Sequence, residues 1–267
     1  MTARMRMRAP AAVVGAASAA TPLGIVVAAQ APPADTSNAA LSKAVDPDPL
    51  AKVSIVVPIG PGDRAWHDLM AGLSRTDPRP EILLVFAAGD PQRDDAPDGL
   101  TVLTAPAGRA HQLNAGMEAA RGEWLWLLHA DSRLRTDTLP ALRRWLADAP
   151  RALGWFRLAF ERDGPRPMRI NAFGANLRAR WLGLPFGDQG FLLHRDDARA
   201  LGPFDPTLPF GEDHAWVWRA RRLGLPLRAV GGTLATSARK YAEHGWVRTT
   251  WRHLRLTWRQ ARSESRR

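Results

Sequence analysis

Short apolar runs alternate with helix-like segments through the middle of this chain, and this alternation constrains the fold more than any other feature. The runs at 53–59 (VSIVVPI), 81–88 (EILLVFAA) and 125–128 (LWLL) end in glycine or polar residues, and 101–103 is a briefer run. Helix candidates lie between or after them, at 63–75, 108–122 and 136–149, the last with Thr136 as its N-cap. Strands that alternate with helices build parallel sheets covered on both faces. We therefore predict an α/β fold.

Residues 1–50 differ from the rest and are left out of this predicted fold. A basic start, MTARMRMR, precedes a stretch rich in Ala, Gly, Ser and Val. Such a start is typical of a signal peptide, here with AAQA as the cleavage site, or of a weak membrane anchor. A disordered extension from a misassigned start codon fits as well. We expect a leader and linker at 1–50, a main domain at 51–236 and a basic segment at 237–267.

Charge and cysteine content limit the possible chemistry. The chain has a formal net charge of +11 and no cysteine, which excludes disulfides, thiolate nucleophiles and Cys-ligated zinc. From residue 239 onward nine Arg and Lys face two Glu, so this tail supplies +7 of the +11. A positive tail favours an anionic partner such as a phosphorylated substrate, an anionic lipid surface or nucleic acid. Genomic base composition explains the arginine excess equally well.

The run at 125–128 delivers a carboxylate where it leaves the core. His129, Ala130 and Asp131 follow it directly. In open α/β sheets ligands bind outside the carboxyl ends of the strands, and a carboxylate placed there can hold a hard divalent cation. The competing interpretation is that Asp131 only caps the next helix.

A second pair of carboxylates opens a helix in the other half of the chain. This half reads as a strand at 153–161, a helix at 167–183 and an amphipathic helix that starts with Glu212 and Asp213. Acidic residues in a first turn suit the helix dipole. A carboxylate fixed at a helix start beside a cleft is also a good general base. The residues alone leave both interpretations open.

Five segments in this order resemble the family 2 glycosyltransferases: VSIVVPI, GRAHQLNAGMEAARG, LLHADSRL, FGDQGFLLHR and GEDHAWVWRARRLG. The resemblance spans about residues 52–258. HADSRL, FGDQG and TSARK…GWVRTT are similar, more narrowly, to the bacterial radical-SAM/selenodomain-associated transferase 2 subgroup. The resemblance implies the GT-A fold, a Rossmann-like, mostly parallel sheet with helices on both faces, as a single domain plus a C-terminal basic helix.

The resemblance also implies an activity, in which a sugar moves from a nucleotide-diphosphate sugar to a hydroxyl acceptor with inversion. Asp131 matches the last carboxylate of a DxD-type metal motif, with His129 in its first position. The expected cation is Mg²⁺ or Mn²⁺, which would bridge the donor's diphosphate. Asp213 matches the catalytic base, and Glu212 is expected to orient the acceptor or its neighbour.

The remaining implied site residues bind the donor. Gly187 and Gly190 are expected to permit close approach of the backbone to this pocket. Arg109 and Asn114 match an RxxQxNxG element near the diphosphate, although a solvated helix face also accounts for Arg109. The full predicted donor-binding set is Arg109, Asn114, Asp90, Asp188, Gln189, Arg239, Lys240 and Arg248.

One departure from the family pattern concerns the nucleobase. The family usually places an acid at the end of the second strand, but here the run reaches Phe86, Ala87 and Ala88, and the first acid is Asp90. Either Asp90 substitutes, or base recognition is altered or lost. Phe86 stacks on a base in one interpretation and belongs to the core in the other. A noncatalytic GT-A-like binding protein is therefore the main alternative.

The C-terminal segment has the pattern of a basic amphipathic helix. Trp251, Leu254 and Trp258 fall on one face, with arginines mostly elsewhere. This pattern suits a helix on an anionic membrane; the alternative is that both Trp pack on the core. We expect a cytoplasmic protein, peripheral on the inner face of the cell membrane, with a lipid-linked hydroxyl acceptor. A nucleotidyltransferase and a nonspecific nucleic-acid binder are weaker alternatives, and no module for specific nucleic-acid recognition is apparent.

Overall fold

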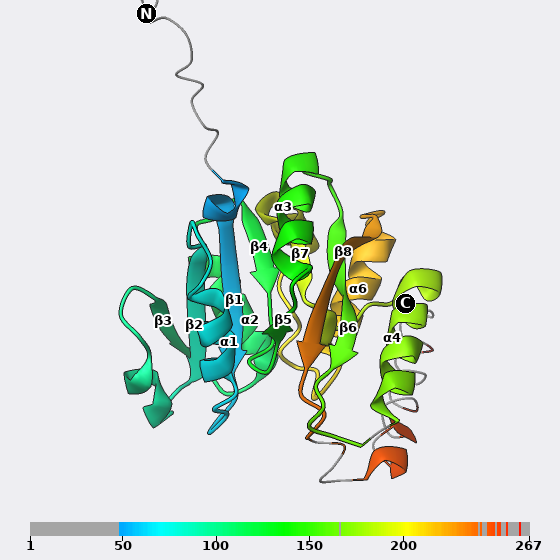
Figure 1. Cartoon of the computed structure of the whole chain (residues 1–267). Coiled ribbons are helices and arrows are strands. Elements are labelled where there is room, and N and C mark those ends of the chain that lie inside the picture. Colours follow the sequence, from blue (N-terminus) through cyan, green and yellow to red (C-terminus); the bar gives the residue numbers. More distant parts are fainter. Residues whose placement is uncertain are drawn as a thin grey trace, which may run out of the picture. The chain divides into compact units, whose positions relative to one another are not determined.

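The strands of the protein form one mixed sheet (Figure 1). The computed structural model describes residues 48–165 and 167–239, together with 241, 245–248, 250, 251, 255 and 262. In this part the strands are β1 (Val53–Ile59), β2 (Glu81–Ala87), β3 (Thr101–Ala105), β4 (Trp124–Leu127), β5 (Arg133–Leu134), β6 (Leu153–Phe160), β7 (Phe191–His194) and β8 (Leu227–Thr236). The leader at 1–47 lies outside the described residues, and the predicted division into 1–50, 51–236 and 237–267 stays a prediction.

The helices alternate with these strands along much of the chain. They are α1 (Trp66–Leu73), α2 (Arg109–Ala119), α3 (Thr138–Asp148), α4 (Met168–Leu182), α5 (Arg195–Leu201) and α6 (Glu212–Arg222). Three short 3₁₀ turns accompany them: η1 (Pro49–Lys52), η2 (Pro91–Asp95) and η3 (Gly187–Gln189). Among the described residues no helix is long and apolar enough to cross a membrane.

The sheet order is β3-β2-β1-β4-β7-β6-β8-β5. Strand β1 pairs in parallel with β2 and β4, and β2 pairs in parallel with β3. Strand β7 runs antiparallel to both β4 and β6, whereas β6 and β8 are parallel. The predicted parallel sheet is therefore confirmed for its first half, and β7 reverses direction where the two halves join.

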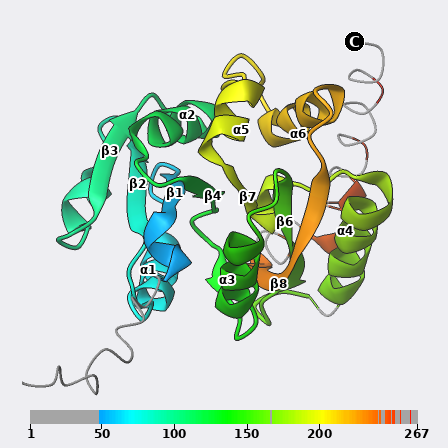
Figure 2. The ribbon, with the colours of Figure 1, turned by 90° about the horizontal axis from the view of Figure 1, so that it is seen from above.

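Helices cover both faces of the sheet, as the alternation predicts (Figure 2). Helices α1 and α3 pack on one face through Trp66 and Trp145. Helices α2, α5 and α6 pack on the other through residues such as Leu113 and Trp216. Strand β1 is buried along its whole length because its alternate side chains enter these two cores. This explains why its sequence is continuously apolar.

The start of α3 differs from the prediction. Thr136 is not its N-cap, because the helix begins at Thr138 with Asp137 as the cap residue. The Asp137 carboxylate instead accepts hydrogen bonds from the backbone N and Oγ1 of Thr233, at 3.3 and 2.8 Å. The polar residues before this helix therefore tie it to β8.

Candidate active site

The turn after β4 presents Asp131 at the carboxyl end of the parallel strands. Two hydrogen bonds between His129 and Ser132 hold this turn. Ser132 N donates to His129 O and His129 N donates to Ser132 Oγ, each at 3.1 Å. Asp131 Oδ2 accepts a 2.9 Å hydrogen bond from Oγ1 of Thr236, the last residue of β8. The capping interpretation of Asp131 is therefore wrong, since the cap residue of α3 is Asp137 and the Asp131 carboxylate contacts the end of β8.

Arg109 joins this turn to the start of α6. Its Nε donates to Glu212 Oε1 at 3.0 Å, and its Nη2 donates to His129 Nε2 at 2.7 Å. A guanidinium has no acceptor, so Nε2 of His129 is the acceptor in this contact. Arg109, the first residue of α2, thereby positions both the Glu212 carboxylate and the His129 imidazole.

Asp213 and Gly187 form the centre of the site. Asp213 Oδ2 accepts a 2.7 Å hydrogen bond from Gly187 N, and Oδ1 accepts one of 2.8 Å from His214 N. A Cβ added to Gly187 would lie 2.9 Å from His129 Nε2, 3.0 Å from Asp213 Oδ2 and 3.4 Å from Arg109 Nη2. Three polar groups from separate elements therefore converge on this glycine.

A pocket opens at this convergence. Arg109, His129, Gly187 and Asp213 supply its polar groups. Its apolar walls are Leu113, Leu127, Leu128, Phe191 and Phe204. The cavity measures about 10 Å³, which is room for about one water molecule, so it marks the place where these side chains meet.

Asp188, next to Gly187, is an ionisable residue that is partly buried. Burial raises the pKa of its carboxyl from 3.8 to about 6; the nearby Arg178 opposes this rise, and Asp213 adds to it. Within the described structure its Oδ1 is buried without a hydrogen-bond partner. A carboxyl with a raised pKa and a buried oxygen without a hydrogen bond is a feature of functional sites.

Arg178 of α4 is the residue at this site that the sequence analysis missed. Its guanidinium lies over the Phe186 ring at 3.5 Å from the centroid, and its Nε donates to Leu184 O at 2.9 Å. Burial lowers its pKa, while the charges of Asp188 and Asp213 act in the opposite direction. Its sequence neighbourhood, LRARW, gives no signal because Arg180 lies two residues away in the same pattern.

Two predicted donor-binding residues, Asn114 and Gln189, use their side chains within the protein. Asn114 exchanges hydrogen bonds with the backbone N and O of Phe204, at 2.8 and 2.9 Å. Gln189 is fully buried and donates to Phe156 O at 3.2 Å. The structure does not bring either amide into the pocket, and both hold the loops around it.

Asp90 also acts between loops. Its Oδ1 accepts from Gln92 N at 3.0 Å and its Oδ2 from Gly62 N at 3.1 Å, so it links the loops after β2 and β1. These bonds, led by that from Gln92, lower its pKa. Phe86 is fully buried and meets Trp66 edge-on, with ring centroids 5.7 Å apart. The core interpretation of Phe86 is therefore confirmed and the base-stacking one is wrong.

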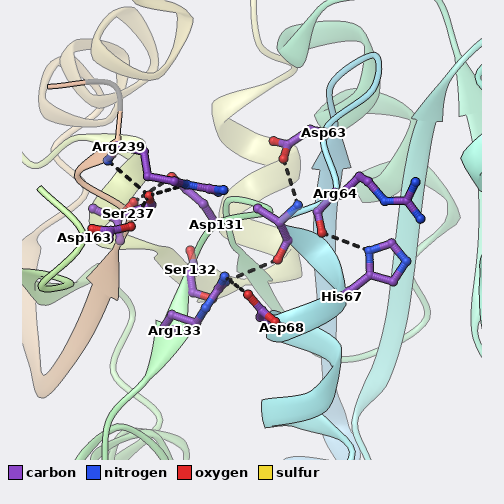
Figure 3. Close-up of polar contacts among 12 residues, drawn as sticks. Asp63, Arg64, His67, Asp68, Asp131, Ser132, Arg133, Asp163, Ser237 and Arg239 are labelled. Carbon is purple, nitrogen blue, oxygen red and sulfur yellow. Dashed lines mark hydrogen bonds and ion pairs between the residues drawn. The ribbon is translucent and has the colours of Figure 1, made fainter. Parts of the chain in front are cut away.

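The remaining predicted basic residues follow β8. Arg239 Nε donates to Ser237 Oγ at 3.0 Å, and Ser237 Oγ donates to Asp163 Oδ2 at 2.5 Å, a group that Figure 3 shows at the same end of the sheet as Asp131. Arg248 is exposed. Lys240 lies outside the described residues.

The donor set suits a divalent cation that is only partly held by protein. The described residues contain no cluster of three His, Cys, Asp or Glu side chains able to enclose an ion. Asp131 offers one carboxylate at the strand ends, whereas Nε2 of His129 is already taken by Arg109. Mg²⁺ commonly binds through one or two carboxylates, with phosphate oxygens and water completing its shell. Asp131 therefore supplies one candidate oxygen ligand for such an ion.

The sheet order and the helices on its two faces define the GT-A fold of glycosyltransferases. In agreement, the family model described as "Glycosyl transferase family 2" matches residues 74–202, slightly less than half of the chain. No curated protein sequence matches the chain.

Several solved structures share the fold. TarS from S. aureus, residues 1–349 in complex with UDP-GlcNAc, has a TM-score of 0.54 at 14% identity, covering 70% of this chain and 58% of that one. The mannosyltransferase PcManGT from Pyrobaculum calidifontis, in complex with GDP-Man and Mn²⁺, has a TM-score of 0.55 at 22% identity, covering 80% and 66%.

Glucosyl-3-phosphoglycerate synthase from Mycobacterium tuberculosis, in complex with Mn²⁺, UDP and phosphoglyceric acid, has a TM-score of 0.51 at 16% identity and covers 70% of each chain. This chain spans between 36% and 60% of the length of the TarS chains. At these identities the likeness establishes the fold.

Proposed function

We propose that this protein is a family 2 glycosyltransferase that moves a sugar from a nucleotide-diphosphate sugar to a hydroxyl acceptor with inversion. The observation that carries the proposal is the convergence of Asp213, Arg109 and His129 on Gly187 in one pocket. This pocket lies at the carboxyl ends of the parallel strands, where open α/β sheets bind ligands. The family match and the nucleotide-sugar complexes of the structural neighbours support it.

Asp213 acts as the base in this proposal. As the acceptor oxygen attacks the anomeric carbon, Asp213 takes the hydroxyl proton, a new C–O bond forms, and the bond to the diphosphate breaks on the opposite face. The Gly187 and His214 N–H groups hold the carboxylate in one orientation, which a general base requires. Glu212 instead holds Arg109, because its carboxylate accepts the Arg109 Nε bond.

Asp131 would hold the Mg²⁺ or Mn²⁺ that enters with the donor, with Thr236 fixing the carboxylate. The bound cation would neutralise charge on the leaving diphosphate. Mn²⁺ in two of the structural neighbours supports this assignment. Arg109 places further positive charge at the pocket, and Arg178 does so beside Asp188. We assign donor binding to this region, with Arg239, Lys240 and Arg248 as residues of the segment that follows β8.

A second candidate, a GT-A-like protein with lost or altered nucleotide binding, is favoured by one observation. Strand β2 ends in the buried residues Phe86 and Ala87, and both carboxylate oxygens of Asp90 accept backbone hydrogen bonds. Asp90, the first acid after β2, therefore has no carboxylate oxygen that lacks a hydrogen bond.

Thermal unfolding with nucleotides separates these candidates. With Mn²⁺ and UDP, GDP, dTDP or CDP in turn, we expect one nucleotide to raise the midpoint by roughly 5–10 °C at a hundred times its dissociation constant. The rise should require Mn²⁺ and disappear in Asp131→Ala. The matched control, Asp98→Ala, removes an exposed carboxylate elsewhere and should keep the rise. No rise with any nucleotide would favour the second candidate.

Gly187→Ala should damage the site directly. The added methyl group would crowd His129 and Asp213, so turnover should fall by on the order of 10²-fold as the carboxylate moves. Release of nucleoside diphosphate from the active donor measures this loss. Gly174→Ala is the matched control, because no atom lies within 4 Å of its added Cβ. Equal turnover in the two variants would remove Gly187 from the site.

A further inference from the structure

Helix α4 carries a row of exposed apolar side chains. Four of them are between 45% and 76% exposed: Leu177, Ile170, Phe173 and Trp181. Their spacings of three, four and four residues place them along one side of the helix. We call this row the α4 stripe. Contiguous exposed apolar surface of this kind marks an interaction site.

The opposite side of α4 fixes the direction of the stripe. Asn176 exchanges hydrogen bonds with the backbone of Leu158 in β6, at 2.8 and 2.9 Å. Met168 and Ala179, which also belong to α4, are buried. A rotation of α4 that turned the stripe toward the core would break these contacts. The stripe therefore stays on the surface.

The surroundings of the stripe are basic. The sequence from 164 to 183 contains four arginines and no Asp or Glu. Arg169 and Arg180, next in sequence to Ile170 and Trp181, are both exposed. Aromatic and aliphatic side chains bordered by arginine fit a surface that is apolar within and anionic at its edge.

The segment after β8 extends this surface. Asn171 of α4 accepts a 3.1 Å hydrogen bond from Trp246 Nε1 and donates one of 3.0 Å to Thr250 Oγ1. In this attached segment Val247 and Trp251 are 58% and 69% exposed. Trp251 is therefore not packed on the core, whereas Leu254 and Trp258 of the predicted amphipathic face lie outside the described residues.

We propose that the α4 stripe, with Val247 and Trp251 beside it, docks on an anionic membrane surface. Apolar side chains would enter the boundary between headgroups and acyl chains, and arginines would contact lipid phosphates. A second copy of the chain is a less suitable partner for the stripe than an anionic membrane. A two-fold contact through the stripe would bring Arg169 and Arg180 of both copies together, with no acid between 164 and 183 to pair with them. This inference rests on the surface alone and does not depend on the proposed function.

Vesicle sedimentation of the full chain tests the proposal. The wild type should bind vesicles containing about one third phosphatidylglycerol in phosphatidylcholine, bind pure phosphatidylcholine far less, and weaken with added salt. Phe173→Ser with Trp181→Ser should lower the partition coefficient at least about tenfold, or about 1.4 kcal/mol. Leu223→Ser is the matched control, since Leu223 is 60% exposed at the end of α6 and should leave binding unchanged.

Three results would overturn the proposal. The double variant could bind like the wild type, which would assign lipid contact to the tail alone. The wild type could bind neither kind of vesicle. Light scattering could show a dimer that the double variant converts to a monomer without any vesicle binding, which would assign the stripe to a second copy. All variants should unfold at the wild-type temperature, because the exchanged side chains are exposed.

Discussion

Asp213→Asn should abolish nearly all sugar transfer while leaving nucleotide binding in place. An amide cannot take the acceptor proton, and a positioned general base contributes roughly 10²–10⁴-fold. We therefore expect the rate of nucleoside diphosphate release to fall by that factor. The nucleotide-dependent rise in unfolding temperature should persist, since the variant retains Asp131 and Arg109.

Glu212→Gln is the matched control for this prediction. It changes the neighbouring carboxylate in the same first turn of α6, yet it keeps an oxygen that can accept from Arg109 Nε. Its turnover should therefore fall far less than that of Asp213→Asn. If the two variants lost activity equally, or if Glu212→Gln lost more, the base assignment would be wrong.

Asp188→Asn should stabilise the fold and impair the site. Burial raises the Asp188 pKa to about 6, so its ionised form is unfavourable in the folded protein. The cost is full above about pH 6 and vanishes below the unfolded pKa, where the carboxyl is protonated in both states. At pH 8 the variant should gain about 2–3 kcal/mol, or roughly 5–10 °C, and near pH 4 the gain should disappear.

Calorimetry of both proteins between pH 4 and pH 8 measures this difference. Asp98→Asn, at an exposed carboxylate, should follow the wild type throughout. A stabilised variant with reduced turnover would fit a carboxyl retained for function at a cost in stability. Destabilisation at pH 8 would mean instead that the attraction between Asp188 and Arg178 outweighs the burial of the charge.

The strands of the first half could be predicted because their sequences report burial directly. The run at Val53–Ile59 is almost entirely apolar since both of its faces are covered, and the structure places β1 at the predicted residues. Strands β7 and β8 were not predicted. The residues Phe191–His194 form only a short run, and Leu227–Thr236 begins with partly exposed residues and includes two glycines, which weaken a strand pattern.

The site was less predictable than the fold, because a motif does not say which of its polar groups face the ligand. Arg109 and Asp213 converge on Gly187, whereas Asn114 and Gln189 form hydrogen bonds with backbone groups elsewhere. Arg178 could not be distinguished from neighbouring arginines until the path of α4 placed it over Phe186. Contacts of this kind depend on how the helices and strands pack together, and a local sequence pattern does not report that packing.

Product analysis tests the central claim most directly. The protein, Mn²⁺ and the nucleotide-diphosphate sugar that stabilises it would be incubated with hydroxyl acceptors, including lipid-linked ones, and the products followed by mass spectrometry and NMR. The account predicts free nucleoside diphosphate and an acceptor heavier by one sugar residue, with the anomeric configuration of the donor inverted. An acceptor heavier by a nucleoside monophosphate would indicate nucleotidyl transfer, and a retained configuration would exclude single displacement; either result would contradict the account.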